Sequence, residues 1–147
     1  MPPIPVKPGT YEIDGTILGG RAVVTAGEHA SEHGVPLITN RPLYPPFQQT
    51  WTIEPLEPIP GSAYVIRLTH HEQTGIVTAE DKLWVDNVPR QDWAKFTFEP
   101  ALGGFHVLSD NGLALRLVRP GAQIELAPPK QEPQELWHLT FRPFGDE

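Results

Sequence analysis

Trp51-Thr-Ile-Glu-Pro55 returns in altered form as Phe96-Thr-Phe-Glu-Pro100 and again as Leu139-Thr-Phe-Arg-Pro143. The prolines that end these segments are 45 and 43 residues apart, so the segments close three units of similar length. Each unit also opens on an aromatic residue, at Tyr11, Tyr64 and Phe105. A period of this size, filled three times, indicates a repeat architecture.

Four strand-like segments recur in each unit, marked by alternation of apolar and polar residues or by short β-branched runs. They fall near 10–14, 21–26, 35–39 and 49–54, near 63–68, 75–79, 82–86 and 94–99, and near 104–108, 113–118, 123–127 and 136–142. Asp14-Gly15 and Asn111-Gly112 are typical of tight turns. Helix is expected to be nearly absent, since residues 26–33 alone have a helical composition and the stretch is short.

Twelve strands in three repeats predict an all-β chain. Propellers need about four blades or more, whereas a barrel closed by hairpins is complete with three units. We therefore predict a β-trefoil, one domain over residues 1–147 with repeats at about 9–58, 61–102 and 103–144. Four large side chains near the closing strands are expected in the core: Trp51, Phe96, Trp137 and Leu139.

The amino-acid composition argues against several classes of site and partner. The 147 residues include no cysteine, which removes disulfides, thiol catalysis and thiolate metal sites and is typical of a reducing compartment. No signal peptide and no apolar run of about 18 residues is found, so a cytoplasmic location away from membranes is expected. The net charge of -7 repels phosphate backbones and argues against a nucleic-acid partner. We expect a monomer.

The first unit differs most from the other two. Its opening aromatic residue and closing proline are 44 residues apart, against 36 and 38 in the others, and much of the excess lies at 27–34. A loop that one repeat alone carries is a candidate for function, although short surface insertions are also tolerated without one. The candidate residues in this loop are Glu28, His29, Ala30 and Ser31.

A second distinctive loop is Asn40-Arg-Pro-Leu-Tyr-Pro-Pro-Phe47. Its prolines would hold it in one shape, which lowers the entropy lost on binding, and exposed Leu43 and Tyr44 would supply anchors for a partner's cleft. The alternative is that Leu43, Tyr44 and Phe47 turn inward and close one end of the barrel.

Catalytic patterns are weak. His29 and His33 are four residues apart, as zinc ligands on a helix often are, but no third ligand follows. No serine lies in a Gly-x-Ser-x-Gly context, and the aspartates lie at expected turns. We expect no enzyme activity, no metal and no cofactor.

Three segments carry a family resemblance: Gly9-Thr-Tyr-Glu-Ile13, Thr50-Trp-Thr-Ile-Glu54 and Pro128-Pro-Lys-Gln-Glu-Pro133. In these the chain resembles the cysteine-free β-trefoil protease inhibitors of mushrooms, the mycocypins, which act on cysteine proteases, and the mycospins, which act on serine proteases. The resemblance extends over nearly the whole chain. It implies inhibition through surface loops, with proteases as partners.

The resemblance also implies which loops act. In the mycocypin-like mode, a glycine-containing loop and the loop after the third strand block a papain-like cleft, here Gly19, Gly20 and Arg21 with Asn40, Arg41, Leu43 and Tyr44. In the mycospin-like mode the 28–33 loop enters a protease as a substrate would, but it has no Arg or Lys for a trypsin-like pocket. Asn40 or Asn87 could enter an asparagine-selective, legumain-like enzyme. Papain-like or legumain-like proteases are favoured, and serine or aspartic proteases are possible.

A ricin-B-like carbohydrate-binding lectin is the competing interpretation. Gln49-Thr-Trp51 and Gln91-Asp-Trp93 both fit the Gln-x-Trp pattern of such lectins, although one of the two is expected to be a coincidence. Asp86, Asn87 and Trp84 come closest to a sugar-binding set.

Overall fold

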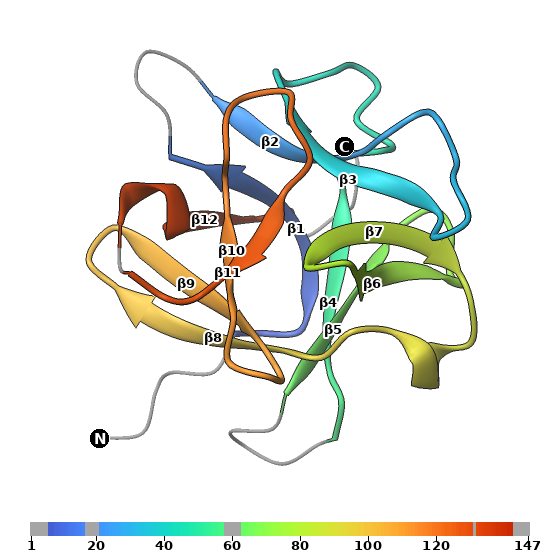
Figure 1. Ribbon diagram of the computed structural model, residues 1–147. Coiled ribbons are helices and arrows are strands. Elements are labelled where there is room, and N and C mark those ends of the chain that lie inside the picture. Colours follow the sequence, from blue (N-terminus) through green and yellow to red (C-terminus); the bar gives the residue numbers. More distant parts are fainter. Residues whose placement is uncertain (1–5, 17–20, 58–62, 131, 143–147) are drawn as a thin grey trace.

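The computed structural model describes residues 6–16, 21–57, 63–130 and 132–142, and their regular secondary structure is mostly strand (Figure 1). The strands are β1 (Gly9–Gly15), β2 (Ala22–Ala26), β3 (Val35–Asn40), β4 (Trp51–Pro55), β5 (Tyr64–Leu68), β6 (Thr74–Ala79), β7 (Lys82–Asn87), β8 (Phe96–Ala101), β9 (Gly104–Ser109), β10 (Ala114–Arg116), β11 (Glu125–Ala127) and β12 (Trp137–Phe141). Every one overlaps a predicted segment, so the all-β prediction is confirmed. Two single-turn 3-10 helices, η1 (Arg90–Asp92) and η2 (Pro133–Glu135), were not predicted.

Six of the strands close into a ring of antiparallel pairs, in the order β1, β4, β5, β8, β9, β12 and back to β1. The other six form three hairpins, β2–β3, β6–β7 and β10–β11. The hairpins also join one another, because β7 pairs with both β3 and β11, and Ile38 bridges to Gln123. A six-stranded barrel with three joined hairpins is the predicted β-trefoil arrangement.

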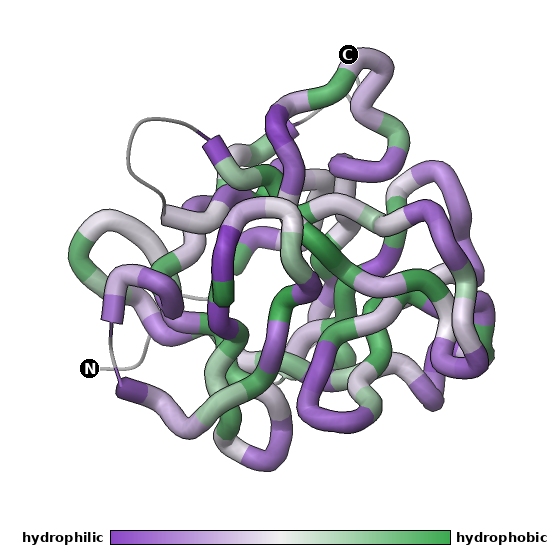
Figure 2. Tube along the Cα trace, turned by 45° about the horizontal axis from the view of Figure 1, so that its top comes forward, coloured by the Kyte–Doolittle hydropathy of each residue, from purple (hydrophilic) through white to green (hydrophobic). Residues whose placement is uncertain are grey.

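The aromatic residues that mark the repeat meet inside the barrel. The opening residue of each unit pairs with the closing residue of the same unit: Tyr11 with Trp51, Tyr64 with Phe96, and Phe105 with Trp137. The three closing side chains are 0% exposed. Hydrophobic residues accordingly gather on the inner strands in Figure 2, and hydrophilic residues occupy much of the outer turns.

The expected alignment of the third closing strand was wrong by two residues. Trp137, rather than Leu139, takes the place of Trp51 and Phe96, and Leu139 is a half-buried residue packed against the core. Side chains two positions apart in a strand face the same side, so the shifted alignment kept the correct inward pattern. Pro143, which ended that segment, lies outside the described residues.

Of the two predicted turns, one is confirmed and one is wrong. Asn111 lies in a turn, and Gly112 after it has φ +85°, where glycine is favoured. Asp14 and Gly15 instead belong to β1 and pair with Val23 and Ala22. A Cβ on Gly15 would lie 3.1 Å from the Trp137 ring, so this glycine serves close packing.

Residues 26–33 form no helix, and neither η1 nor η2 is long and apolar enough to cross a membrane, within the part of the chain that the structure describes.

The two closing tryptophans also make buried hydrogen bonds. The Trp51 indole donates to the Val24 carbonyl at 3.0 Å, and the Trp137 indole donates to the Leu115 carbonyl at 3.1 Å. Each bond joins a closing strand to the second strand of its own unit. Phe96 fills the same place in the second unit without such a donor.

We predict that Trp51→Phe and Trp137→Phe each lower the free energy of unfolding by about 1–3 kcal/mol, because a buried carbonyl loses its donor while the ring keeps most of its volume. Urea denaturation followed by circular dichroism measures this. Tyr44→Phe, a similar change on the surface, should leave stability unaltered. Equal stability of all three variants and the parent would contradict the assigned role of the indoles.

Candidate functional site

The predicted site residues divide between the two ends of the β2–β3 hairpin. Val23 pairs with Asn40 at one end, and Ala26 pairs with Leu37 at the other. Arg21 and the connection 41–50 therefore leave from the first end, whereas the loop 27–34 turns at the second, about 10 Å further along at about 3.3 Å per residue. Figure 1 shows these two loops on different sides of the hairpin. The sequence candidates do not form one continuous site.

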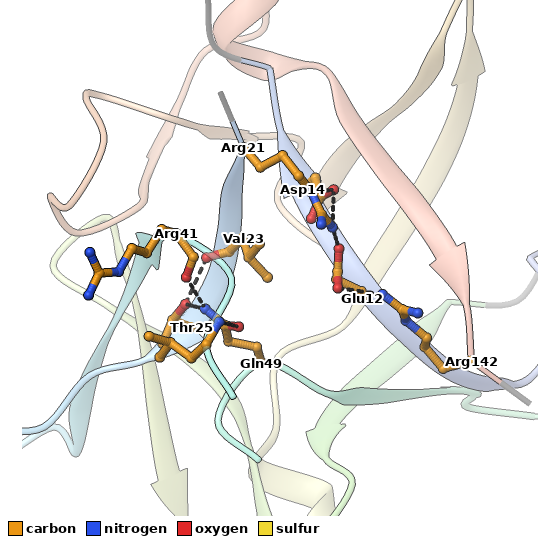
Figure 3. A network of polar contacts seen from close by, with 9 residues as sticks. Glu12, Asp14, Arg21, Val23, Thr25, Arg41, Gln49 and Arg142 are labelled. Atoms are coloured by element: carbon orange, nitrogen blue, oxygen red, sulfur yellow. Dashed lines mark hydrogen bonds and ion pairs between the residues drawn. The ribbon is translucent and has the colours of Figure 1, made fainter. Parts of the chain in front are cut away.

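A buried amide holds the connection between β3 and β4, which we call the 41–50 connection. Gln49 is 2% exposed. Its Oε1 accepts the Leu43 N–H at 2.8 Å, and its Nε2 donates to the Arg41 carbonyl at 2.8 Å and to Thr25 Oγ1 at 3.0 Å (Figure 3). The end of the connection thus fixes its beginning, and both are fastened to β2.

Further bonds hold the second half of the 41–50 connection. The Ala26 N–H donates to the Gln48 carbonyl at 2.9 Å. The Pro46 carbonyl accepts both the Gln49 N–H at 3.0 Å and the Thr50 hydroxyl at 2.8 Å. Three prolines restrict the backbone between these bonds. The connection is therefore held in one shape without any partner.

Aromatic side chains project from this fixed backbone. Tyr44 is 96% exposed, and Phe47 is 44% exposed with its ring 4.9 Å from the His70 ring. Leu43 is half-buried. The alternative in which all three close the barrel therefore fails for Tyr44 and Phe47, and Tyr44 stands out as an anchor.

Charged side chains near this end of the hairpin form ion pairs with carboxylates of β1 in the barrel wall. Arg21 forms an ion pair with Glu12 and another with Asp14 at 3.1 Å, and Arg142 reaches Glu12 at 2.7 Å (Figure 3). Burial raises the pKa of Asp14, and the positive charge of Arg142 offsets part of this effect. The Arg21 guanidinium is thus already paired, and we do not place it on the partner-facing surface.

Asn40 and Arg41, two further predicted residues, also lie at this end of the hairpin. Asn40 ends β3, and its side-chain oxygen accepts the Arg41 N–H at 2.8 Å. The guanidinium of Arg41 is exposed and has no polar partner among the described residues. Gly19 and Gly20 lie outside the described residues.

The loop 27–34 has an exposed tip and a fixed base. Glu28, His29, Ala30 and Ser31 are all exposed. A Cβ on Gly34, at φ +106°, would lie 2.3 Å from the Val85 carbonyl oxygen, so the base of the loop lies directly on β7.

His33 fastens the same base from its side chain. Its ring packs 5.1 Å from the ring of Trp84, and its Nε2 is 3.6 Å from a carboxylate oxygen of Glu80. The enlarged loop is therefore attached to the second unit.

Comparison of the three units shows why the 41–50 connection is distinctive. Each connection to a closing strand is held by one buried side chain just ahead of the closing aromatic residue. These are Gln49, Trp93, whose indole donates to the Val88 carbonyl at 3.0 Å, and Glu135, which accepts the Lys130 N–H at 3.0 Å and pairs with Arg116 at 3.0 Å. In the described parts of the three connections, only the first presents exposed aromatic side chains.

The sequence pattern gave a partial signal for these residues. Gln49-Thr-Trp51 stands out as a Gln-x-Trp pattern, but the pattern does not reveal that Gln49 holds the connection. Glu135 lies at the same spacing before Trp137. Gln91-Asp-Trp93 is the coincidental match, because Trp93 belongs to the connection and Phe96 is the closing residue.

No protein-family model matches this sequence, and no characterised protein matches it at the level of sequence. Solved structures do match. They include the Rhizoctonia solani agglutinin, at 16% identity over 95% of this chain and 99% of that one, with a TM-score of 0.75. A β-trefoil named BEL has 15% identity over 96% and 98% of the two chains and a TM-score of 0.67.

A proteinase inhibitor from Coprinopsis cinerea also matches, at 19% identity over 93% of this chain and 99% of that one, with a TM-score of 0.62. At these identities the likeness establishes the fold alone. The chain is a β-trefoil, and its structural neighbours include both an agglutinin and a proteinase inhibitor.

We predict that Gln49→Ala destabilises the protein by about 2–4 kcal/mol, since it leaves buried polar groups without partners and opens a cavity. The amide of Leu43 should also exchange its hydrogen faster, because it loses its acceptor. Hydrogen exchange followed by NMR measures the second effect. Gln48→Ala, an exposed neighbour, is the control, and unchanged exchange at Leu43 in Gln49→Ala would refute the role of this amide.

Proposed function

We propose that this chain is a protease inhibitor, and that the 41–50 connection blocks the active-site cleft of a cysteine protease. The main support for this proposal is that Tyr44 is 96% exposed on a loop whose backbone is hydrogen-bonded to the buried side chain of Gln49. The Coprinopsis cinerea inhibitor shares the fold, and the mycocypin-like mode of the sequence resemblance favours a cysteine protease. The protein acts in this proposal as a cytoplasmic monomer of one domain.

The fixed shape of the 41–50 connection favours the free energy of binding. A loop that is ordered before binding loses little conformational entropy when the complex forms. Tyrosine adds a large contact area at the cost of few rotatable bonds and is common among the residues that dominate interface energies. Tyr44 would enter an apolar pocket of the protease, with Phe47 at its side.

The hydrogen bonds of the connection also favour one mode of blocking. The carbonyl of Arg41 and the N–H of Leu43 are both bonded to Gln49, so neither is free to pair with a protease as a substrate backbone would. Trypsin-like inhibition with Arg41 in the specificity pocket would need that carbonyl at the catalytic site. Blocking of a cleft by side chains, without substrate-like insertion, fits the geometry.

Two other modes receive less support. Asn40 is paired with Val23 at the end of β3, which disfavours its entry into a legumain-like enzyme. The exposed tip at 28–31 remains available for a substrate-like mode, but it offers no Arg, no Lys and no large apolar side chain. A serine or aspartic protease is therefore a second choice.

We predict that Tyr44→Ala weakens inhibition by about 30-fold or more, because loss of an interface anchor costs about 2 kcal/mol or more. Inhibition constants should be measured against papain, legumain, trypsin and pepsin. Leu102→Ala is the matched control, since Leu102 is a 99% exposed apolar side chain on the β8–β9 turn. His29→Ala tests the other loop and should leave inhibition unchanged.

The outcomes separate the modes. Inhibition that survives Tyr44→Ala but is lost in His29→Ala would move the site to the 28–31 tip. A parent protein that inhibits none of the four proteases at micromolar concentration would overturn the proposal.

The residues that the sequence predicted for a lectin site are not arranged to bind a sugar. Trp84 is buried, its indole donates to the Ala79 carbonyl at 2.9 Å, and His33 packs against its ring. It offers no open face on which a sugar ring could stack. Asp86 accepts the N–H of Asn87 and so stabilises the end of β7. The set Asp86, Asn87 and Trp84 does not form a sugar site.

A further inference from the structure

A cavity of about 640 Å³ lies on the second unit, between the β5–β6 turn, the connection from β7 to β8, and the barrel wall of β4 and β5. Its residues belong neither to the 41–50 connection nor to the 27–34 loop. It has a buried floor, a wall of ion-paired side chains and a polar rim.

Trp93 forms the floor. It is 3% exposed, and its indole N–H is bonded to the Val88 carbonyl at 3.0 Å. A Cβ on Gly75 would lie 2.4 Å from the indole, so β6 approaches this ring as closely as glycine permits. The Ala94 N–H donates to the Ile76 carbonyl at 2.9 Å and fixes the same contact. The floor is therefore rigid.

An ion-pair chain forms the wall. Glu54 pairs with Arg90 and lies 3.7 Å from Arg67. The Arg67 guanidinium also reaches the Leu68 carbonyl at 3.3 Å, and Arg90 reaches the Pro55 carbonyl at 3.4 Å. Both guanidinium groups are thus largely satisfied, and with Glu72 the lining has two positive and two negative side chains. A lining without net charge favours neither phosphates nor cations.

Three polar side chains on the rim have unused hydrogen-bonding capacity. Glu72, Gln73 and Asn87 are exposed, and their side chains have no polar partner among the described residues. Asn87 pairs through its backbone with Thr74, the residue after Gln73, so the two amides come from adjacent strand ends. A carboxylate accepts hydrogen bonds, and each amide both donates and accepts.

We propose that this cavity binds a neutral, hydroxyl-rich small molecule, a mono- or disaccharide. Adjacent hydroxyl groups both donate and accept, which matches the carboxylate and the two amides, and the lining carries no net charge that would favour a charged ligand. The volume lies in the range of small-molecule sites.

A second, smaller cavity lies at the β8–β9 turn of the third unit and is lined differently. The cavity there measures about 340 Å³ and is lined largely by apolar groups, among them Leu102, Pro133 and Leu136. A sugar would leave most of its hydroxyls without partners in that cavity.

The test is an NMR titration of the whole protein with galactose, glucose, mannose, N-acetylglucosamine and lactose. We expect at least one sugar to cause saturable shifts of the Trp93 indole signal and of the Gln73 and Asn87 amide signals. Asn87→Ala and Glu72→Ala should each weaken binding by about tenfold, the effect of one or two lost hydrogen bonds. Gln134→Ala, an exposed residue of η2, is the control.

Tyr44→Ala should bind the sugar as the parent does, so failure of the inhibitor proposal and failure of this one can be told apart. If inorganic phosphate or glycine shifted these NMR signals saturably and no sugar did, the proposal of a saccharide ligand would be wrong. No saturable shift with any of the five sugars, or shifts unchanged in both Asn87→Ala and Glu72→Ala, would overturn the site.

Discussion

The side chain of Gln49 is the interaction on which the candidate site depends. Its amide supplies one acceptor and two donors, and these bond Leu43, Arg41 and Thr25. Because Gln49 is buried, water cannot replace a lost bond at full value, and the cost of an unpaired group keeps the connection closed. The barrel provides the frame, since Gln49 lies two residues before Trp51, which the core holds fully buried.

The three units use different side chains to hold the connection that leads to the closing strand. A long connection must return to the closing strand, and a buried side chain holds it in each case. A neutral amide does this in the first unit, an indole in the second and a carboxylate paired with Arg116 in the third. The shared scaffold leaves each connection free to differ, so the first exposes Tyr44, the second borders a polar cavity and the third borders a smaller one.

Much of the fold could be predicted from the sequence because the repeat and the period-two pattern are local signals. The same locality explains the errors. Leu139 was aligned with Trp51 because a shift of two residues keeps a side chain on the same face, and Asp14-Gly15 looked like a turn because the packing of Gly15 against Trp137 is a distant contact.

The site was less predictable. Whether Tyr44 points outward depends on the hydrogen bond between Gln49 and Thr25, two residues that are 24 positions apart in sequence. The division of the candidates between two ends of one hairpin follows from the register of β2 and β3, which the sequence pattern does not show. The side chains of the second-unit cavity likewise come from three separate segments.

Hydrogen exchange of the chain, free and in complex with the protease that it inhibits, tests whether the 41–50 connection is the surface that contacts the protease. We predict that complex formation slows exchange within residues 41–48 and leaves exchange within residues 28–34 unchanged. Slower exchange confined to residues 28–34, or to segments away from both loops, would contradict it.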